Sequence, residues 1–473
     1  MNRTLPLVLA VALFMEHMDS TVISTSLPAI AEDIGTSPVA LKLALTAYLV
    51  SLAIFIPISS WMAARFGAKN VFRTAIGVFI VGSICSAFAW SLESFVVSRF
   101  IQGMGGAMMT PLARLILFRG TPRSGFVAAM AWLTIPALVG PMLGPPVGGF
   151  LTTYATWHWI FLINVPIGIA GIWITGRVLP NIARETVPPI DTAGFFLVGI
   201  AAAGVVFGFS VISLPALPPI VGVITILLGL CSAALYLRHS RRVAHPILNL
   251  KLFANKPFRT AILGGTVFRI GTGAVPFLLP LMFQLSFGLT PFQSGLLTFV
   301  TAIGAFGMKF LAPTALRTAG FKVVIIIAGI IGAFLIGANG LFTAQTPYPV
   351  IIATILVAGF LRSLFFTSNN ALIFAEITDR DAAQATAITA VTQQISIALG
   401  VAFGGGVLEL TSVLSGDGLN QHAFKVAFLS VAFVSLCAVL PFFSLPRDTG
   451  SDMTGHRRSR HQPTEDKAMA VQD

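Results

Sequence analysis

The sequence predicts an all-α polytopic membrane protein, and its composition and the spacing of its apolar segments are the two observations that predict it. Hydrophobic residues make up 56% of the 473 residues and charged residues only 10%. Soluble domains of this size need more polar surface than that. Apolar windows long enough to cross about 30 Å of hydrocarbon recur along the chain. We count fourteen such windows, near residues 5–30, 40–63, 70–91, 94–117, 124–152, 158–180, 191–212, 217–237, 258–285, 291–314, 321–343, 348–374, 382–412 and 423–445.

The loops differ in charge, and this difference predicts the orientation. The net charge is +12. With fourteen spans, nearly all loop arginines and lysines fall on the side of the two termini, whereas the opposite loops hold almost only Lys42 and Lys425. Basic loops remain in the cytoplasm, so both termini are expected there. The positive charge is thereby explained by topology, and no nucleic-acid partner is predicted.

Two polar connections divide the chain into parts. Between them lie two spans that carry charged residues only at their ends, and we expect these two spans to face lipid. A faint repeat, Arg65-Phe-Gly67-Ala-Lys69 and Arg317-Thr-Ala-Gly320-Phe-Lys322, supports two equal six-helix halves. The expected division is a six-helix bundle at 1–181, a two-helix insert with cytoplasmic linkers at 182–257, a second six-helix bundle at 258–446, and a disordered cytoplasmic tail at 447–473.

The first apolar window contains two acids, Glu16 and Asp19. An ionised carboxylate in hydrocarbon is costly, so each acid requires a partner, a water-filled cavity or a titrating role. At about 1.5 Å per residue, Asp19 comes about 9 Å below the outer membrane boundary and Arg99 about 8 Å below it. Glu16 similarly comes level with Gln102. A proton site at Asp19 and Glu16, modulated by Arg99, is one interpretation; an ion pair that only fixes helix packing is the other.

A proline-rich and glycine-rich segment interrupts the fifth window. Glycines at this spacing form a smooth stripe along a helix, and prolines remove backbone hydrogen bonds. We expect a bend and a gate hinge here, although close helix packing alone is the alternative. The residues of this segment are Gly140, Pro141, Gly144, Pro145, Gly148 and Gly149.

The second half carries cations deep in its apolar windows, namely Arg269, Arg362 and Lys309, with no acid at a comparable depth. Cations near the midplane favour an anionic ligand. Bonding to carbonyls, or pairing with Glu16 or Asp19 across a cavity, is equally compatible with the sequence. The predicted substrate-cavity residues are Gln102, Arg269, Gln284, Arg362, Asn369 and Asn370.

These motifs resemble those of the major facilitator superfamily, specifically its fourteen-span drug:proton antiporters. The first-helix pattern is present as Asp19, Thr21, Leu27 and Pro28, and the fourth-helix pattern as Arg99, Gln102, Gly103 and Gly105. The antiporter motif Gly-Pro-x-x-Gly-Pro-x-x-Gly-Gly is complete from Gly140 to Gly149. Trp157 to Pro166 and Leu279 to Gly295 match further segments of the family.

One family motif is incomplete. The loop after the second helix retains Arg65, Gly67 and Lys69, but Ala64 stands where the family has an acid, and one arginine is missing. In the family that acid is thought to hold the outward-open form through a charge lock. The resemblance therefore leaves the balance between conformations in this chain open.

The resemblance implies a proton-coupled drug or metabolite exporter that works by alternating access in a bacterial inner membrane. Asp19 and Glu16 are the implied proton carriers. Alternatives are an exporter of an anionic metabolite, such as citrate or its metal chelate, and a passive facilitator. The chain has no HExxH, GxSxG or nucleotide-binding loop, so we expect no enzyme, cofactor or metal site. A monomer in the lipid bilayer is expected, with small-molecule substrate and protons as ligands; whether an envelope adaptor takes part stays open.

Overall fold

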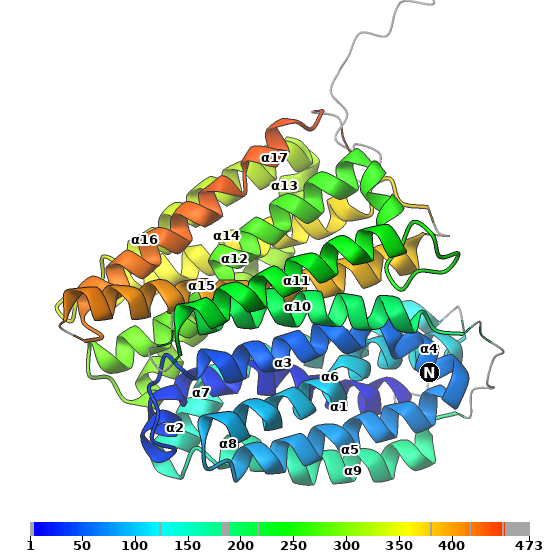
Figure 1. Cartoon of the computed structure of the whole chain (residues 1–473), viewed down its shortest axis with the longest axis horizontal. Helices are drawn as coiled ribbons and strands as arrows, with labels where there is room; N and C mark the ends of the chain where they lie inside the picture. The colour runs from blue at the N-terminus through cyan, green and yellow to red at the C-terminus, as the bar shows by residue number, and fades with distance from the viewer. Residues whose placement is uncertain are drawn as a thin grey trace, which may run out of the picture.

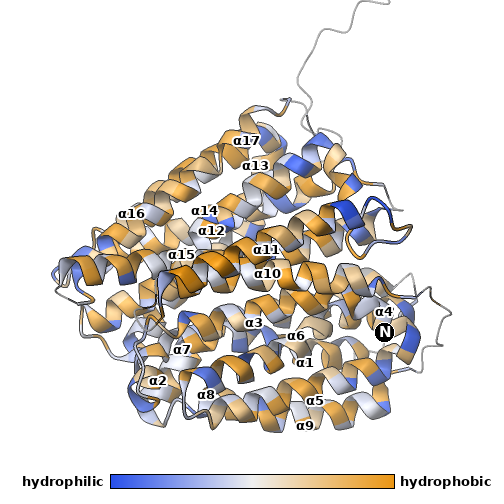
Figure 2. Cartoon of the chain, viewed as in Figure 1, coloured by the Kyte–Doolittle hydropathy of each residue, from blue (hydrophilic) through white to orange (hydrophobic). Residues whose placement is uncertain are grey.

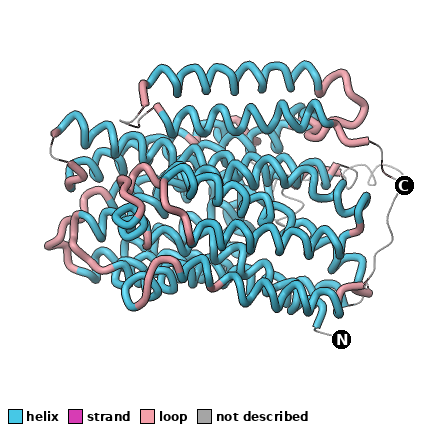
Figure 3. Tube along the Cα trace, turned by 60° about the horizontal axis from the view of Figure 1, so that its bottom comes forward, coloured by secondary structure: helices cyan, strands magenta, loops and turns pink. Residues whose placement is uncertain are grey.

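The computed structural model describes residues 4–446, except 123–124, 181–186, 188, 213, 215–216, 379–380 and 417, together with residue 449. Within these residues all regular structure is helical (Figure 3). The expected disordered tail at 447–473 lies outside the described residues apart from residue 449, so that prediction has no outcome here.

The first half of the chain begins with helices that run back and forth in an antiparallel bundle (Figure 1). Its elements are α1 (Thr4–Val22), η1 (Ile23–Thr25), α2 (Leu27–Asp33), α3 (Lys42–Phe55), η2 (Ile56–Ile58), α4 (Ser59–Phe66), α5 (Ala68–Ala87), α6 (Leu92–Gly120), α7 (Phe126–Tyr154), α8 (Trp159–Leu162) and α9 (Asn164–Val178).

The rest of the chain supplies two insert helices and a second bundle. These elements are α10 (Thr192–Val211), α11 (Pro219–His239), η4 (Leu250–Ala254), α12 (Lys256–Leu285), α13 (Pro291–Asn339), α14 (Tyr348–Ile373), α15 (Ala382–Ser415), α16 (Gln421–Cys437) and α17 (Leu440–Phe443).

Twelve helical segments among the described residues are long and apolar enough to cross a membrane, and Figure 2 shows the apolar residues spread along them. Two helices account for the difference between these twelve segments and the fourteen expected spans. Helix α13 has 49 residues and changes direction at Gly320, so it has the length of two spans. Helix α6 has 29 residues but is not among the twelve, and it carries Glu93 and Arg99 within its length. Fourteen spans therefore stays a prediction.

The faint repeat of the sequence corresponds to a repeated backbone turn. Gly67, between α4 and α5, has φ +91°, and Gly320, at the break of α13, has φ +71°. Only glycine adopts such values without strain. Arg65 is exposed beside the first turn and Lys69 is partly buried. The same turn at matching places in both halves supports their structural equivalence.

The insert lies beside the junction of the two bundles (Figure 1). Helix α10 packs against α3 of the first half and α15 of the second. Helix α11 packs on α10 and exposes large apolar side chains, including Leu227 and Leu228 at 59% and 61%. We expected both insert helices to face lipid. Lipid facing stays a prediction for α11, whereas α10 also covers the α3–α15 seam, where Val206 packs with Val50 and Ala398.

The two halves touch at the end of the molecule where α2 lies, which we call the far end. Gln284 Nε2 donates a hydrogen bond to the Thr25 carbonyl oxygen at 3.0 Å, and Phe292 N donates to Thr153 Oγ1 at 3.1 Å. A Cβ added to Gly149 of α7 would come within 2.3 Å of the Pro291 carbonyl oxygen of α13. The halves are therefore in direct backbone contact at the far end.

A second far-end contact joins α3 to α15. The Lys42 side chain is fully buried although the sequence analysis placed it in a loop. Its stem lies against Gly405, where an added Cβ would be 2.9 Å from Lys42 Cδ. Glu409, one turn along α15, attracts the Lys42 ammonium. Lys42, which was expected in a loop, therefore lies in the interface between the two halves.

Substitution of Gly149 by alanine is expected to destabilise the protein, because the new methyl group cannot fit beside the Pro291 carbonyl and α7 must move from α13. Gly307→Ala is the matched control, since an added Cβ there meets nothing within 4 Å. Alanine also favours the helix over glycine by about 1 kcal/mol. In detergent micelles Gly149→Ala should lower the melting temperature and Gly307→Ala should not. Equal melting temperatures for Gly149→Ala and the parent chain would contradict the contact.

Candidate functional site

An ion pair lies at the centre of the first bundle. Arg99 Nη1 of α6 donates to Asp19 Oδ2 of α1 at 2.7 Å. The other carboxylate oxygen, Oδ1, accepts from Gln102 Nε2 at 2.8 Å and from Asn164 Nδ2 at 2.9 Å. All four side chains are completely buried. Both oxygens of Asp19 are thus saturated by donors from two other helices, which suits the ionised form.

A hydroxyl group extends this cluster to a fourth helix. Ser83 Oγ of α5 accepts from both Gln102 Nε2 and Asn164 Nδ2 at 3.0 Å, and it donates to the Phe161 carbonyl oxygen at 3.1 Å. Glycine allows this approach, because a Cβ on Gly82 would lie 2.5 Å from Gln102. The small residues of α5 and α6 therefore bring the polar groups together.

Arg99 is only partly satisfied by hydrogen bonds. Its Nε and Nη2 atoms are buried and have no hydrogen-bond partner among the described residues. The guanidinium instead lies 4.3 Å from the centre of the Tyr48 ring and 5.6 Å from that of Phe161. Aromatic faces attract a cation, more strongly where water is excluded. Asp19 and two rings therefore balance a charge that is shielded from water and from lipid.

Glu16 occupies a separate and more accessible position. Its Oε2 lies 2.5 Å from His17 Nδ1, and the His17 side chain is 32% exposed. Tyr48 Oη donates to Glu16 Oε1 and Thr110 Oγ1 donates to Oε2, both at 3.4 Å. Gln102, which was expected at the level of Glu16, donates to Asp19 and Ser83 instead, and Glu16 lies beside Gly106 and Thr110 further along α6. Tyr48 instead connects Glu16 to the ring-covered face of Arg99.

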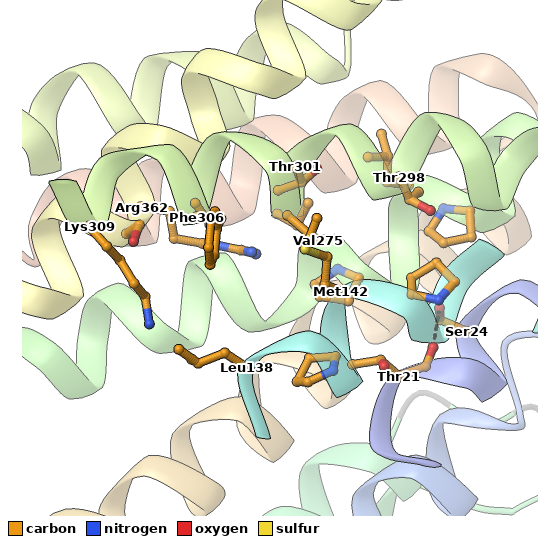
Figure 4. Close-up of a pocket in the computed structure, with 18 residues that line it drawn as sticks. Thr21, Ser24, Leu138, Met142, Val275, Thr298, Thr301, Phe306, Lys309 and Arg362 are labelled. Atoms are coloured by element: carbon orange, nitrogen blue, oxygen red, sulfur yellow. Dashed lines mark hydrogen bonds between the residues drawn. The ribbon is translucent and has the colours of Figure 1, made fainter. Parts of the chain in front are cut away.

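A cavity of about 270 Å³ lies between the two halves. Helices α1, α7, α12, α13 and α14 and the short η1 contribute to its wall. Lys309 and Arg362 lie at one end, and Ser24 and Thr298 lie at the other (Figure 4). The described lining residues include these two cations and no carboxylate. The electrostatic character of the cavity is therefore positive.

The six predicted cavity residues separate in the structure. Only Arg362 is among the residues that line this cavity. Gln102 belongs to the Asp19 cluster instead. Arg269 Nη2 donates to Asn370 Oδ1 at 3.1 Å, and its guanidinium lies 4.6 Å from the centre of the Phe366 ring.

The remaining two are also held away from this cavity. Asn369 is buried, with both side-chain polar atoms lacking a hydrogen-bond partner among the described residues. Gln284 is bonded to the first half at the far end. The depth of a residue along its helix therefore did not predict whether it lines the cavity, because depth does not determine the direction in which the side chain points.

The glycine stripe of α7 is a packing surface against α1. An added Cβ would meet the Phe14 carbonyl oxygen from Gly140, Thr21 Oγ1 from Gly144 and the Val22 carbonyl oxygen from Gly148, at 2.8, 1.9 and 2.1 Å. Helix α7 is continuous through its prolines. The proline segment therefore does not interrupt the helix.

The prolines of the same segment have a different position. Pro141 and Pro145 line the cavity. The segment thus joins the helix of Asp19 to the cavity wall, and its role as a hinge stays a prediction.

Asp19→Asn is expected to cost roughly 3–5 kcal/mol of folding stability, because it leaves the buried Arg99 charge without its counter-charge. The double variant Asp19→Asn with Arg99→Gln removes both charges and should recover part of that loss. Urea titrations of the purified variants in detergent give the comparison. If the double variant is less stable than Asp19→Asn alone, Arg99 is not balanced chiefly by Asp19.

Proteins of known sequence are similar to this chain over nearly its whole length. The chain is 33% identical over 459 residues to "Putative multidrug resistance protein MdtD" of Klebsiella pneumoniae subsp. pneumoniae, covering 96% of this chain and 97% of the relative. It is 33% identical over 457 residues, with the same coverage, to the protein of that name from Escherichia coli O17:K52:H18.

Solved structures show the same fold at lower identity. A POT family transporter in complex with a thioalcohol-conjugated peptide matches with a TM-score of 0.67 and 16% identity over 92% of this chain and 94% of that one. The D-xylose-proton symporter matches with a TM-score of 0.65 and 16% identity over 94% and 98%. The family model described as Major Facilitator Superfamily matches residues 9–194 and 261–466. The chain therefore belongs to the major facilitator superfamily, and it is a membrane transporter rather than an enzyme.

Proposed function

We propose that this transporter is a proton-coupled exporter that works by alternating access, in a bacterial inner membrane with both termini in the cytoplasm. The observation that carries the proposal is the Asp19–Arg99 pair, which is fully buried within the first bundle. Burying an ion pair is costly, and ionisable residues within membrane spans commonly serve ion or substrate pathways. The names of the relatives, which refer to multidrug resistance, support the direction of transport.

The arrangement of the halves supports alternating access. Contacts at Gly149, Gln284 and Lys42 close the far end, while the cavity lies inward from them. Opening the far end requires α7 to leave α13 and α3 to leave α15. Because α7 packs tightly on α1 through Gly144 and Gly148, a movement of α7 also displaces α1, the helix that carries Asp19.

A series of polar groups leads from the surface toward Asp19. His17 is partly exposed and contacts Glu16, which accepts a hydrogen bond from Tyr48 Oη; the Tyr48 ring covers Arg99. In the present conformation Arg99 favours the ionised form of Asp19. If movement of α1 separates the pair, the carboxylate loses its counter-charge and takes up a proton. Release then follows when the pair forms again.

In proteoliposomes, Asp19→Asn should abolish the release of protons that accompanies substrate addition, because a neutral amide cannot exchange a proton. Substrate binding should persist, and its persistence shows that the variant is folded. Glu32→Gln is the matched control, since Glu32 is an exposed acid on α2. Proton release is followed with a pH-sensitive dye inside the vesicles. Normal proton coupling in Asp19→Asn contradicts the proposal, and substrate flux without proton movement in the parent chain indicates a passive facilitator.

A second candidate concerns the substrate. Lys309 and Arg362 face a cavity without a carboxylate among its described lining residues. An anionic metabolite, such as a di- or tricarboxylate or its metal chelate, is complementary to these cations, and arginine binds carboxylates with paired hydrogen bonds. Lipophilic cations gain no such attraction. We therefore extend the proposal to an exporter of anions in place of, or beside, cationic drugs.

Arg362→Gln should weaken the binding of a tricarboxylate such as citrate by about 10-fold or more, corresponding to the loss of a charge-assisted hydrogen bond. Binding of a cationic dye should be unchanged or stronger. Arg238→Gln, an exposed substitution outside the cavity, is the control for the change in net charge. Competition between citrate and a fluorescent dye in detergent measures both affinities. Equal citrate affinity in the parent chain and Arg362→Gln removes the anion proposal and leaves proton coupling untouched.

A further inference from the structure

A second pocket, separate from the cavity, lies where α11 ends and the linker to the second half begins. Its volume is about 470 Å³. Arg241, Lys251 and Ser240 supply polar groups, whereas Leu237 and Phe253 supply apolar surface. The described residues that line it include no acid. The pocket thus combines two positive charges with an apolar wall.

The loop that shapes this pocket is held by a tyrosine. Tyr236 Oη of α11 donates to the Leu248 carbonyl oxygen and accepts from Leu248 N, both at 2.8 Å, and these groups are buried. Asn249 N donates to Gln384 Oε1 of α15 at 3.0 Å. These bonds fix the segment before Leu250 against two helices.

An aspartate anchors the other side of the loop. Asp191 accepts from Gly194 N at 2.8 Å and from Ile247 N at 3.3 Å, and its Oδ1 lies 2.6 Å from His239 Nε2. Partial burial opposes ionisation, but the hydrogen bonds from His239 and the two backbone N–H groups lower the pKa of Asp191 below its ordinary value. Asp191 thus holds the end of α11 and the segment before η4 together, and Arg241 and Lys251 line the pocket beside them.

The apolar side of the pocket continues along the membrane-facing surface of α11. Leu230 and Leu237, seven residues apart and so on one face of the helix, are about half exposed, at 53% and 50%. In the sequence these leucines are followed directly by three basic residues, Arg238, Arg241 and Arg242. This change from apolar to basic marks the level at which a spanning helix leaves the hydrocarbon for the headgroup region.

We propose that this pocket binds the phosphate of an anionic phospholipid, with the acyl chains lying along the exposed leucines of α11. Arg241 and Lys251 neutralise the phosphate, and Ser240 lies beside it. Basic pockets at the cytoplasmic boundary of membrane helices suit such headgroups. A soluble phosphate compound shares the headgroup chemistry but lacks the acyl chains, so the apolar surface of α11 favours the lipid.

A bound lipid at this place would have a defined structural effect. The loop connects the insert to α12 through η4, and Asn249 ties it to α15. A phosphate between Arg241 and Lys251 would join the end of α11 to η4, and so hold the insert to the second half. The inference concerns lipid binding alone and does not depend on the proposed transport activity.

The test uses the full chain in a neutral detergent and native mass spectrometry to count bound lipids. Phosphatidylglycerol should be retained in preference to phosphatidylcholine of the same acyl composition. The double variant Arg241→Gln with Lys251→Gln should weaken phosphatidylglycerol retention by about 25-fold, since each basic residue near an anionic lipid contributes about 5-fold. The matched control is Arg238→Gln with Arg242→Gln, which removes the same charge from exposed neighbours outside the pocket lining.

Three results would overturn the proposal. Equal retention of the two lipids by the parent chain shows that there is no site for an anionic headgroup. Equal losses in the pocket variant and the control variant show diffuse attraction to a basic surface. Inorganic phosphate that displaces phosphatidylglycerol at equal concentration shows a site for soluble phosphate. The charge-retaining variant Arg241→Lys with Lys251→Arg should keep most of the binding, which separates loss of charge from loss of folding.

Discussion

A carboxylate and a guanidinium removed from both water and lipid impose the strongest constraint on this structure. Asp19 needs donors on both oxygens, and α6 and α9 supply them through Arg99, Gln102 and Asn164. Helix α5, which supplies Ser83 to the cluster, comes close to α6 because Gly82 has no side chain where it meets Gln102. The buried pair thus accounts for three features of the first bundle. Polar side chains gather at one depth, aromatic rings cover the face of Arg99 that has no hydrogen-bond partner, and small residues let the helices approach.

The same constraint relates the site to movement. Helix α1 carries Asp19 and, two residues later, Thr21 on the cavity wall. Helix α7 packs closely on α1, with Gly144 against the Thr21 side chain and Gly148 against the Val22 carbonyl oxygen. The face of α7 at Gly149 meets α13 of the other half. Helix α7 therefore contacts both the helix that carries Asp19, the proposed proton carrier, and the closure between the halves, which gives a physical basis for coupling them.

Several parts of this arrangement were predictable from the residues. The common depth of Asp19 and Arg99 follows from helical rise, and their hydrogen bond confirms it. Close packing by the stripe at Gly140, Gly144 and Gly148 is confirmed as well. The contributions of Tyr48 and Ser83 were not predicted, because a single tyrosine or serine in an apolar helix carries no spacing signal. Gln102 was expected on the cavity wall but bonds to Asp19 in the structure, since depth along a helix does not specify which neighbour the side chain meets.

The sequence by itself determined the membrane class, the helical elements and the identity of the charged residues at mid-depth, because hydrophobicity, helical rise and loop charge are local properties. Only the tertiary structure decided which of those charges pair, which line the cavity and which lie between the halves. Lys42 shows the difference: its position near the end of a helix indicated a loop, yet packing of α3 on Gly405 of α15 buries it. Which charged residues pair depends on the rotation of each helix about its axis and on contacts between residues distant in the chain. No local sequence pattern determines the rotation or the contacts.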